Sequence, residues 1–400
     1  MWRDSRLQLL LAIGSLTVMT GAVIAPNLPE IIHQLHLEPG VAGTLVSLHF
    51  LTVALSVPLF GVLADAVGAL PVLIPALVCY GLLGVAGAAM SSLIPLMVMR
   101  GLLGVATGGI TAASLGLLGK LYQGDERSQV LAYAASTISL ANIVYPLLAG
   151  WLGSFSWQLA FGLYGVALPL AIAASSVFRK TSTLESDTTS PSSDPAVTSL
   201  SHTLPQLLRH PPTLRLLLAL GTTSGIVYAS IVYIPLYMRM TLAANTILIA
   251  IVLASKAMGA TIISAFGTRP IAKACGNLGA IALGYGVMAF TLILLPQLHE
   301  FALILPTAIV FGMGFGIVVP SLYGTLSNQA STQLQSSILA AGTGSGFFGQ
   351  FLSPILLAPV FTNGGISVVF YTAAIVALGA GLLIVSLGQH RTNHATLGKR

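Results

Sequence analysis

The stretch VAGTLVSLHFLTVALSVPLFGVLADAVGAL, residues 41–70, decides the fold. Its first 24 residues, 41–64, carry no formally charged side chain, and about 20 apolar residues are enough to cross a bilayer as a helix. Asp65 and Gly68 interrupt the run for only a few residues before the next apolar run begins at 70. The pattern predicts two membrane-spanning helices joined by a tight turn.

The whole chain has this character. Of its 400 residues, 55% are hydrophobic and 6% are charged, against about 25% charged in a soluble domain. This composition excludes nucleic-acid binding as the reason for the net charge of +6. Apolar runs broken by polar, Gly or Pro residues predict an all-α membrane protein with twelve transmembrane helices. These helices are expected near 7–29, 41–64, 70–90, 93–115, 129–152, 157–178, 213–237, 244–266, 275–296, 301–325, 334–358 and 366–388.

The two cysteines, Cys79 and Cys275, lie inside or at the edge of apolar runs. This placement supports neither a disulfide framework nor a zinc or iron–sulfur site. The sequence also has no recognisable nucleophile–base pairing, phosphate loop or metal-ligand cluster. We therefore expect no enzymatic activity, no metal and no cofactor.

Basic residues indicate how the chain is oriented. With the N-terminus inside, only Arg239 of the 14 basic residues in tails, loops and span ends falls on the outer side. Cytoplasmic loops of membrane proteins carry an excess of Lys and Arg, so both termini are expected to be cytoplasmic. The 13 residues expected on the cytoplasmic side are Arg3, Arg6, Lys120, Arg127, Arg179, Lys180, Arg209, Arg215, Arg269, Lys273, Arg391, Lys399 and Arg400.

One hydrophilic segment divides the spans into six and six. Its centre, TSTLESDTTSPSSDP at 181–195, has the composition of a disordered linker. We therefore expect a six-helix bundle over 1–178, a cytoplasmic linker over 179–212 and a second six-helix bundle over 213–400. The halves also echo each other, since Asn142-Ile-Val-Tyr145-Pro146 and Gln350-Phe-Leu-Ser353-Pro354 lie 208 residues apart. Two pseudo-symmetric bundles are the architecture of many secondary transporters.

Local motifs give this architecture a family resemblance. Gly61-Val-Leu-Ala-Asp65-Ala-Val-Gly68-Ala-Leu is similar to the G-x-L-a-D-r-x-G-r-k signature of the major facilitator superfamily, although Ala66, Ala69 and Leu70 replace its basic residues. Arg100-Gly-Leu-Leu-Gly104 resembles the R-x-x-x-G motif of the fourth helix in that family. The resemblance implies that Asp65, with the matching Gly61 and Gly68, forms a latch on the cytoplasmic side of the transporter.

The fifth span indicates a subgroup of that family. Ala141-Asn-Ile-Val-Tyr145-Pro146-Leu-Leu-Ala149-Gly150 is similar to the G-x-x-x-G-P-x-x-G-G pattern of exporters, and Trp157-Gln-Leu-Ala-Phe161 opens the sixth span as in many exporters. Tyr145 departs from the pattern. Proline removes a helical hydrogen bond, so Pro146 and Pro354 are expected pivots, with Gly104 and Gly150 allowing close helix contact.

Charges within spans point to function, because an intramembrane charge is costly and usually faces a partner or a cavity. Arg100 in the fourth span and Lys256 in the eighth are the two cations, and His49 in the second span is titratable. No carboxylate lies in mid-span, which disfavours a cationic-drug exporter. A cavity that holds Arg100 and Lys256 would attract an organic anion.

Each of these residues also has a structural interpretation. Arg100 either contacts substrate or hydrogen-bonds a neighbouring helix, and Lys256 could instead be held against backbone carbonyls. His49 either relays protons or hydrogen-bonds a Ser or Thr on an adjacent helix. Aromatic and polar residues on helices that line the cavity in this superfamily complete the candidate site: Asn142, Tyr145, Tyr228, Tyr233, Tyr323 and Gln350.

The predicted function is proton-coupled efflux of a small, amphiphilic and anionic organic compound by alternating access. The substrate is expected to be a metabolite, a siderophore-like chelator or a drug. The expected location is the inner membrane of a bacterium, where the protein would work as a monomer, and His49 or Lys256 would exchange the proton. The alternatives are an importer of an organic anion or a sugar, and a membrane sensor or scaffold that does not transport.

Overall fold

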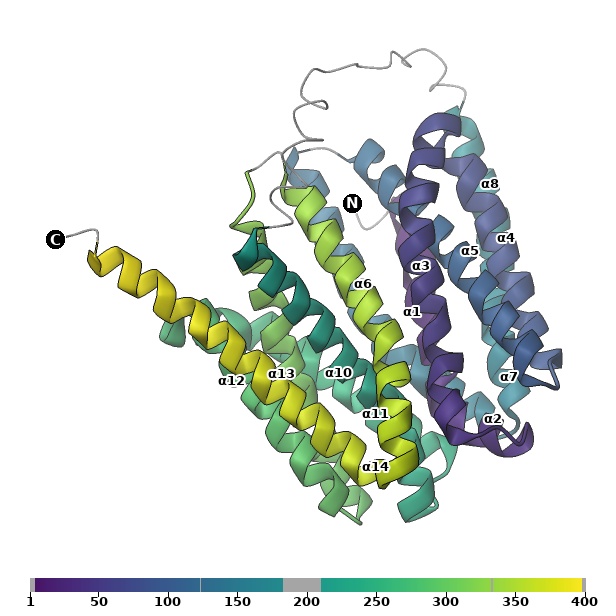
Figure 1. The fold of residues 1–400 in the computed structure, drawn as a ribbon. Coiled ribbons are helices and arrows are strands. Elements are labelled where there is room, and N and C mark those ends of the chain that lie inside the picture. Colours follow the sequence, from purple (N-terminus) through teal and green to yellow (C-terminus); the bar gives the residue numbers. More distant parts are fainter. Residues whose placement is uncertain (1–3, 123, 183–209, 332–333, 398–400) are drawn as a thin grey trace. The chain divides into compact units, whose positions relative to one another are not determined.

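The computed structural model describes residues 4–122, 124–182, 210–331 and 334–397, and over these residues the protein is all-helical (Figure 1). The expected linker at 179–212 lies mostly outside this part of the chain. The helices before it are α1 (Ser5–Ala22), η1 (Ala25–Asn27), α2 (Leu28–Gln34), α3 (Pro39–Val67), α4 (Ala69–Ala86), η2 (Gly87–Ala89), α5 (Leu93–Leu121), α6 (Gly124–Gly153), α7 (Trp157–Phe161), η3 (Gly162–Val166) and α8 (Ala167–Ser182).

The helices after the linker begin at Pro211. They are α10 (Pro211–Leu242), α11 (Thr246–Ile262), the π-helix η5 (Ile263–Gly267), α12 (Thr268–Leu294), η6 (Leu295–Gln297), α13 (Phe301–Ser327) and α14 (Gln335–Leu397).

Ten helical stretches of the described chain are long and apolar enough to cross a membrane. Eight of them coincide with single predicted spans. The other two are Thr246–Gln297, with 52 residues, and Ser337–Ile384, with 48 residues. Because about 20 helical residues cover the 30 Å of a bilayer core, each of these stretches is long enough for two crossings.

A glycine breaks each of these two long stretches. Gly276 in α12 has φ 74° and Gly365 in α14 has φ 77°, values that residues with a Cβ rarely adopt. Both lie within two residues of the position where the sequence predicts the next span to start, at 275 and 366. The short polar connections predicted there are therefore helical in the structure, and the change of direction comes at the glycine.

The helices form two compact units. The first takes the described residues up to Ser182 together with Met238–Ala254, and the second takes His210–Tyr237 and the described residues from Ser255 onward. In the first unit α3 packs against α5, α4 against α5 and α8, and α1 against α5 and α6. In the second, α12 packs against α13 and α14.

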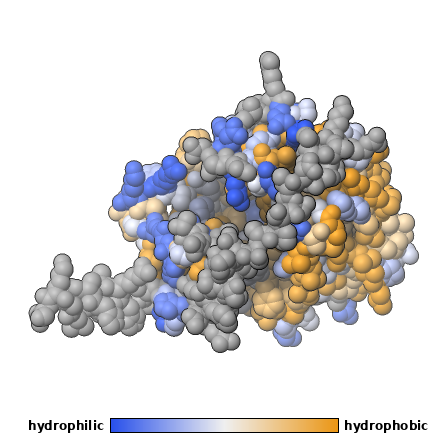
Figure 2. All heavy atoms as spheres, turned by 90° about the horizontal axis from the view of Figure 1, so that it is seen from above, coloured by the Kyte–Doolittle hydropathy of each residue, from blue (hydrophilic) through white to orange (hydrophobic). Residues whose placement is uncertain are grey.

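Much of the outer surface of the helices is apolar, as the orange side chains in Figure 2 show. Large hydrophobic residues such as Leu59, Ile94, Phe266 and Leu382 are more than two-thirds exposed. A soluble protein would bury such side chains, whereas a membrane protein exposes them to lipid chains. The structure is thus a multi-pass membrane fold, as the composition predicts.

A close helix contact recurs in both units. A Cβ at Gly104 of α5 would collide with the backbone of α3 at His49, and a Cβ at Gly312 of α13 would collide with the backbone of α11 at Lys256. Gly312 follows Gly104 by 208 residues, and Lys256 follows His49 by 207. The repeat seen in the sequence therefore recurs as a repeated contact between helices.

Candidate functional site

Arg100 is buried in the first unit, with 1% of its surface exposed. It lies on α5, and its Nη1 donates to the Thr20 carbonyl of α1 at 2.7 Å, while Nη2 donates to the Val46 carbonyl of α3 at 3.3 Å. Nη1 also lies 3.4 Å from the hydroxyl of Tyr164. The planar guanidinium can serve several acceptors at once, so Arg100 joins three helices.

His49 is the titratable neighbour of Arg100. Its Nδ1 lies 3.1 Å from Arg100 Nη2 and 2.8 Å from the Val46 carbonyl. With a proton on Nδ1 the ring donates to Val46, and without one it accepts from Arg100. The imidazole can therefore exchange partners when its tautomer changes, which is compatible with both the structural and the proton-relay interpretation.

Lys256 is the buried cation of the second unit, with 7% of its surface exposed. Its Nζ donates to Ser230 Oγ of α10 at 2.8 Å and lies 5.9 Å from the centre of the Phe311 ring of α13. Both neighbours are neutral. Within the described residues no carboxylate lies within ion-pair distance of Lys256. The one ion pair in this part of the chain is in the first unit, where Arg239 lies 3.4 Å from Glu30.

Arg100 and Lys256 each lie beside the close glycine contact of their own unit. Arg100 is one turn before Gly104 on α5, whereas Lys256 lies opposite Gly312 on α11. In the first unit the cation is on the helix that carries the glycine. In the second unit it is on the helix that the glycine contacts. The two cations also differ in their hydrogen bonds, because the terminal nitrogens of Arg100 are engaged by several groups and the ammonium of Lys256 by one hydroxyl.

The other predicted binding residues are dispersed. Asn142 is exposed, and its Nδ2 donates to the Ile138 carbonyl of its own helix at 3.0 Å. Tyr145 is half-buried, and its hydroxyl lies 2.7 Å from Ser15 Oγ of α1. Neither residue is hydrogen-bonded to Arg100 or His49, which are hydrogen-bonded to each other.

In the second unit the predicted tyrosines differ in exposure. Tyr228 and Tyr233 are buried on α10, whereas Tyr323 and Gln350 are partly exposed. The Tyr323 hydroxyl lies 3.2 Å from Thr343 Oγ1 of α14.

The predicted latch and pivots have mixed surroundings. Asp65 is exposed near the end of α3, between Gly61 and Gly68, and it forms no ion pair with the described residues. Pro146 lies inside α6 and Pro354 inside α14, and their role as pivots stays a prediction. A Cβ at Gly150 would collide with Ala250 of α11, so the small residue allows close contact there.

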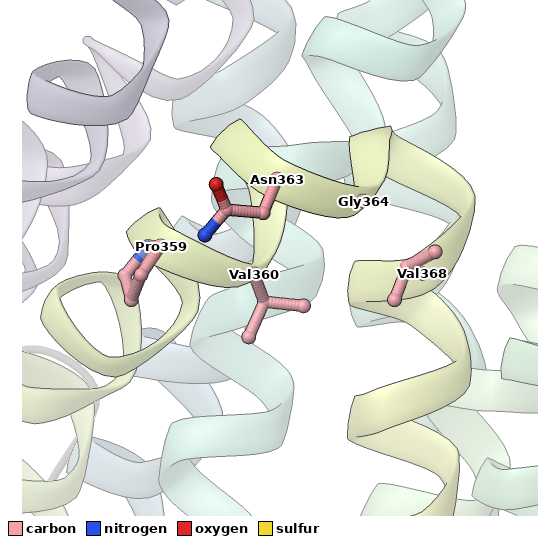
Figure 3. Close-up of a pocket in the computed structure, with 5 residues that line it drawn as sticks. All are labelled: Pro359, Val360, Asn363, Gly364 and Val368. Carbon is pink, nitrogen blue, oxygen red and sulfur yellow. The ribbon is translucent and has the colours of Figure 1, made fainter.

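One surface hollow lies outside the candidate site. It is found at the turn of α14 and is lined by Pro359, Val360, Asn363, Gly364 and Val368 (Figure 3). Asn363 is its one polar side chain, and no charged group lines it. This hollow does not have the chemistry of an anion site.

Sequence reasoning missed the residues that surround the two cations. Ser230, Phe311 and Tyr164 are neutral residues on helices far away in sequence from the cation that each contacts. Serine, phenylalanine and tyrosine are ordinary in spans, so no local pattern distinguished them. Only the helix packing identifies them.

These features define a class of protein: a multi-pass, all-helical membrane protein with a buried cation in each of two helical units. Residues 10–354 match the sequence profile of the Major Facilitator Superfamily. The chain belongs to this superfamily of transporters, and the predicted family is confirmed.

Solved structures share the fold. A bacterial homologue of the human lysosomal transporter Spinster, in an inward-facing and occupied conformation, has a TM-score of 0.74 and 13% identity, covering 96% of this chain and 94% of that one. A peptide transporter, POT, in complex with sulfate has a TM-score of 0.77 and 15% identity, with the same coverage of both chains. At these identities the likeness shows the fold alone. The sequence matches no curated protein at a significant level.

Proposed function

We propose that the protein is a proton-coupled exporter of a small, amphiphilic organic anion in the inner membrane of a bacterium. It would work as a monomer with twelve crossings, in bundles at 1–178 and 213–400, with both termini cytoplasmic. Alternating access of the two bundles would move the substrate. The transporter superfamily supports transport, and the exporter-like pattern around Pro146 favours efflux.

One observation carries the proposed substrate class. Lys256 is buried, and the groups found around its Nζ, the Ser230 hydroxyl and the Phe311 ring, are neutral. A buried charge is costly unless it is paired, and a carboxylate is the natural partner of an ammonium group. An anionic substrate would supply the missing charge.

The hydrogen bonds of Arg100 favour a structural role for it over direct contact with the substrate. Its two terminal nitrogens already serve backbone carbonyls in helices α1 and α3, while its buried Nε has no partner among the described residues. We therefore assign Arg100 to holding the first bundle together and Lys256 to contacting the anion. The proton would be exchanged at Lys256, with His49 as the second candidate because its Nδ1 has two alternative partners.

The test is substrate-induced proton movement in proteoliposomes, with organic acids and cationic drugs screened in parallel. We expect proton flux that depends on an organic acid, and its loss in Lys256→Ala. Lys256→Arg should retain anion binding but lose proton coupling, because a guanidinium keeps its proton at working pH. Flux with cationic drugs that survives Lys256→Ala would contradict the proposal.

A matched set of variants separates the two candidates for proton exchange. If His49 exchanges the proton, His49→Gln should lose proton coupling while Lys256→Arg retains it. The direction of proton flux relative to the substrate distinguishes efflux from uptake. An exporter driven by an inward proton gradient moves protons against the substrate, whereas an importer of an organic anion or a sugar, which remains the alternative, moves them with it. A complete absence of flux with every compound would favour the sensor or scaffold.

A further inference from the structure

We propose that Ser230 and Phe311 are positioning residues, which hold the Lys256 ammonium so that its remaining N–H groups are available to a substrate carboxylate. The inference rests on the proposed function and adds two residues to its site. Ser230 lies on α10, Phe311 on α13 and Lys256 on α11. Three helices of the second unit thus fix one side chain.

The Ser230 hydroxyl is oriented by its own helix. Its Oγ donates to the Val227 carbonyl one turn earlier. A hydroxyl has a single hydrogen, so only lone pairs are left to face Lys256, whose Nζ lies 2.8 Å away. Ser230 can therefore accept from an ammonium group, and it is completely buried, so water does not compete for this position.

Phe311 restricts the ammonium from a second side. Its ring centre lies 5.9 Å from Nζ, within the range of a cation–π contact, and the side chain is buried. Neither the hydroxyl nor the ring cancels the positive charge. Two of the three ammonium hydrogens have no partner among the described residues, so an incoming carboxylate can accept a hydrogen bond without displacing an existing ion pair.

Arg100 of the first unit, to which we assign a structural role, offers a comparison. There α1 supplies a backbone carbonyl, that of Thr20, to the guanidinium of Arg100. In the second unit α10 supplies the side-chain oxygen of Ser230 to Lys256. Arg100 is thus held by backbone carbonyls of two helices, whereas the hydrogen bond that holds Lys256 leaves its other N–H groups for a substrate.

The experiment uses purified full-length protein and three probes of similar shape: benzoate, benzamide and benzylammonium. Binding is measured by the rise in thermal unfolding midpoint as each probe is titrated. The wild type should be stabilised by benzoate and much less by the neutral and cationic probes. Ser230→Ala should raise the half-saturating benzoate concentration about tenfold or more, the effect expected from loss of one charge-assisted hydrogen bond.

Matched variants separate positioning from general damage to the fold. Ser230→Thr keeps a hydroxyl and should bind benzoate like the wild type. Phe311→Leu keeps the apolar volume but loses the ring face, so the half-saturating concentration should rise about threefold. Ser321→Ala removes a buried hydroxyl of α13 that has no hydrogen-bond partner in the described chain, and it should change nothing.

The outcomes distinguish this inference from the function on which it rests. If Ser230→Ala binds benzoate like the wild type while Lys256→Ala does not, the positioning role is wrong and the proposed function stands. If Lys256→Ala also binds benzoate like the wild type, or the three probes stabilise the wild type equally, both are wrong. Equal weakening of benzoate and benzamide in Ser230→Ala would indicate a structural role and overturn the inference.

Discussion

At the scale of single residues, the two buried cations differ in how replaceable they are. Arg100 serves Thr20 and Val46 with two nitrogens of one rigid group. A lysine has one nitrogen and cannot span both carbonyls in the same geometry. Arg100→Lys therefore keeps the charge but leaves a buried acceptor unsatisfied, which should lower the free energy of unfolding by about 1–3 kcal/mol.

The measurement for Arg100→Lys is thermal unfolding in detergent, followed by the signal of the folded fraction. Arg127→Lys is the matched control, because Arg127 is exposed on α6. It should unfold at the wild-type temperature. If Arg100→Lys did so too, the guanidinium would not be a structural link, and direct contact with substrate would become the better explanation for a buried arginine.

At the scale of elements, a proline and a π-helix in the second unit are linked through one carbonyl. Pro320 in α13 has no N–H, so the Gly316 carbonyl one turn earlier lacks its usual helical donor. Ser264 Oγ of η5 donates to this carbonyl at 2.8 Å, and Thr268 Oγ1 of α12, 3.2 Å away, shares its hydrogen between this carbonyl and that of Ile263. Hydroxyls from neighbouring helices thus compensate for the bond that proline removes.

This compensation can be tested with a double-mutant cycle. In the wild-type background, Ser264→Ala with Thr268→Val should cost about 1–2 kcal/mol of unfolding free energy. In a Pro320→Ala background, an alanine N–H can bond to Gly316, so the same pair of changes should cost clearly less. Equal losses in both backgrounds, measured by unfolding in mixed micelles, would show that the hydroxyls do not replace the missing donor.

The sequence predicted elements better than their connections. Run length and scarcity of charge located the spans, because lipid permits few alternatives to a long apolar helix. The same rules placed loops after 266 and 358, whereas the structure turns through η5 and at Gly276 and Gly365. Hydropathy located both breaks to within two residues, but not the helical backbone on either side of them, because a single glycine with positive φ can turn a chain that stays helical up to the turn.

For the candidate site, the sequence predicted the charged and titratable residues but not the groups that they contact. Arg100, Lys256 and His49 were identified because charge is costly in a membrane, and that rule acts on each residue alone. Their partners Ser230 and Thr20 could not be identified in this way. A hydroxyl or a carbonyl becomes a partner only when two helices distant in sequence come together, and spacing along the chain does not determine that contact.

At the scale of the whole molecule, the two long helical stretches decide the topology. If Thr246–Gln297 and Ser337–Ile384 each cross twice, the chain has twelve crossings and both ends lie on one side. The turn at Gly276 would then face the cytoplasm, next to Arg269 and Lys273, and the turn at Gly365 would face the opposite side. Native Cys275 lies beside the first turn and is exposed.

Labelling with a membrane-impermeant maleimide can therefore show on which side of the membrane each turn lies. In a Cys79→Ser background, Cys275 should react in inside-out vesicles and be protected in right-side-out vesicles. With both native cysteines replaced by serine, Asn363→Cys should show the reverse pattern, since Asn363 is exposed at the second turn. Reaction of both sites from one side would mean that the stretch between them crosses an even number of times. The twelve-crossing topology requires three crossings there, so that result would exclude it, and with it the placement of both termini in the cytoplasm.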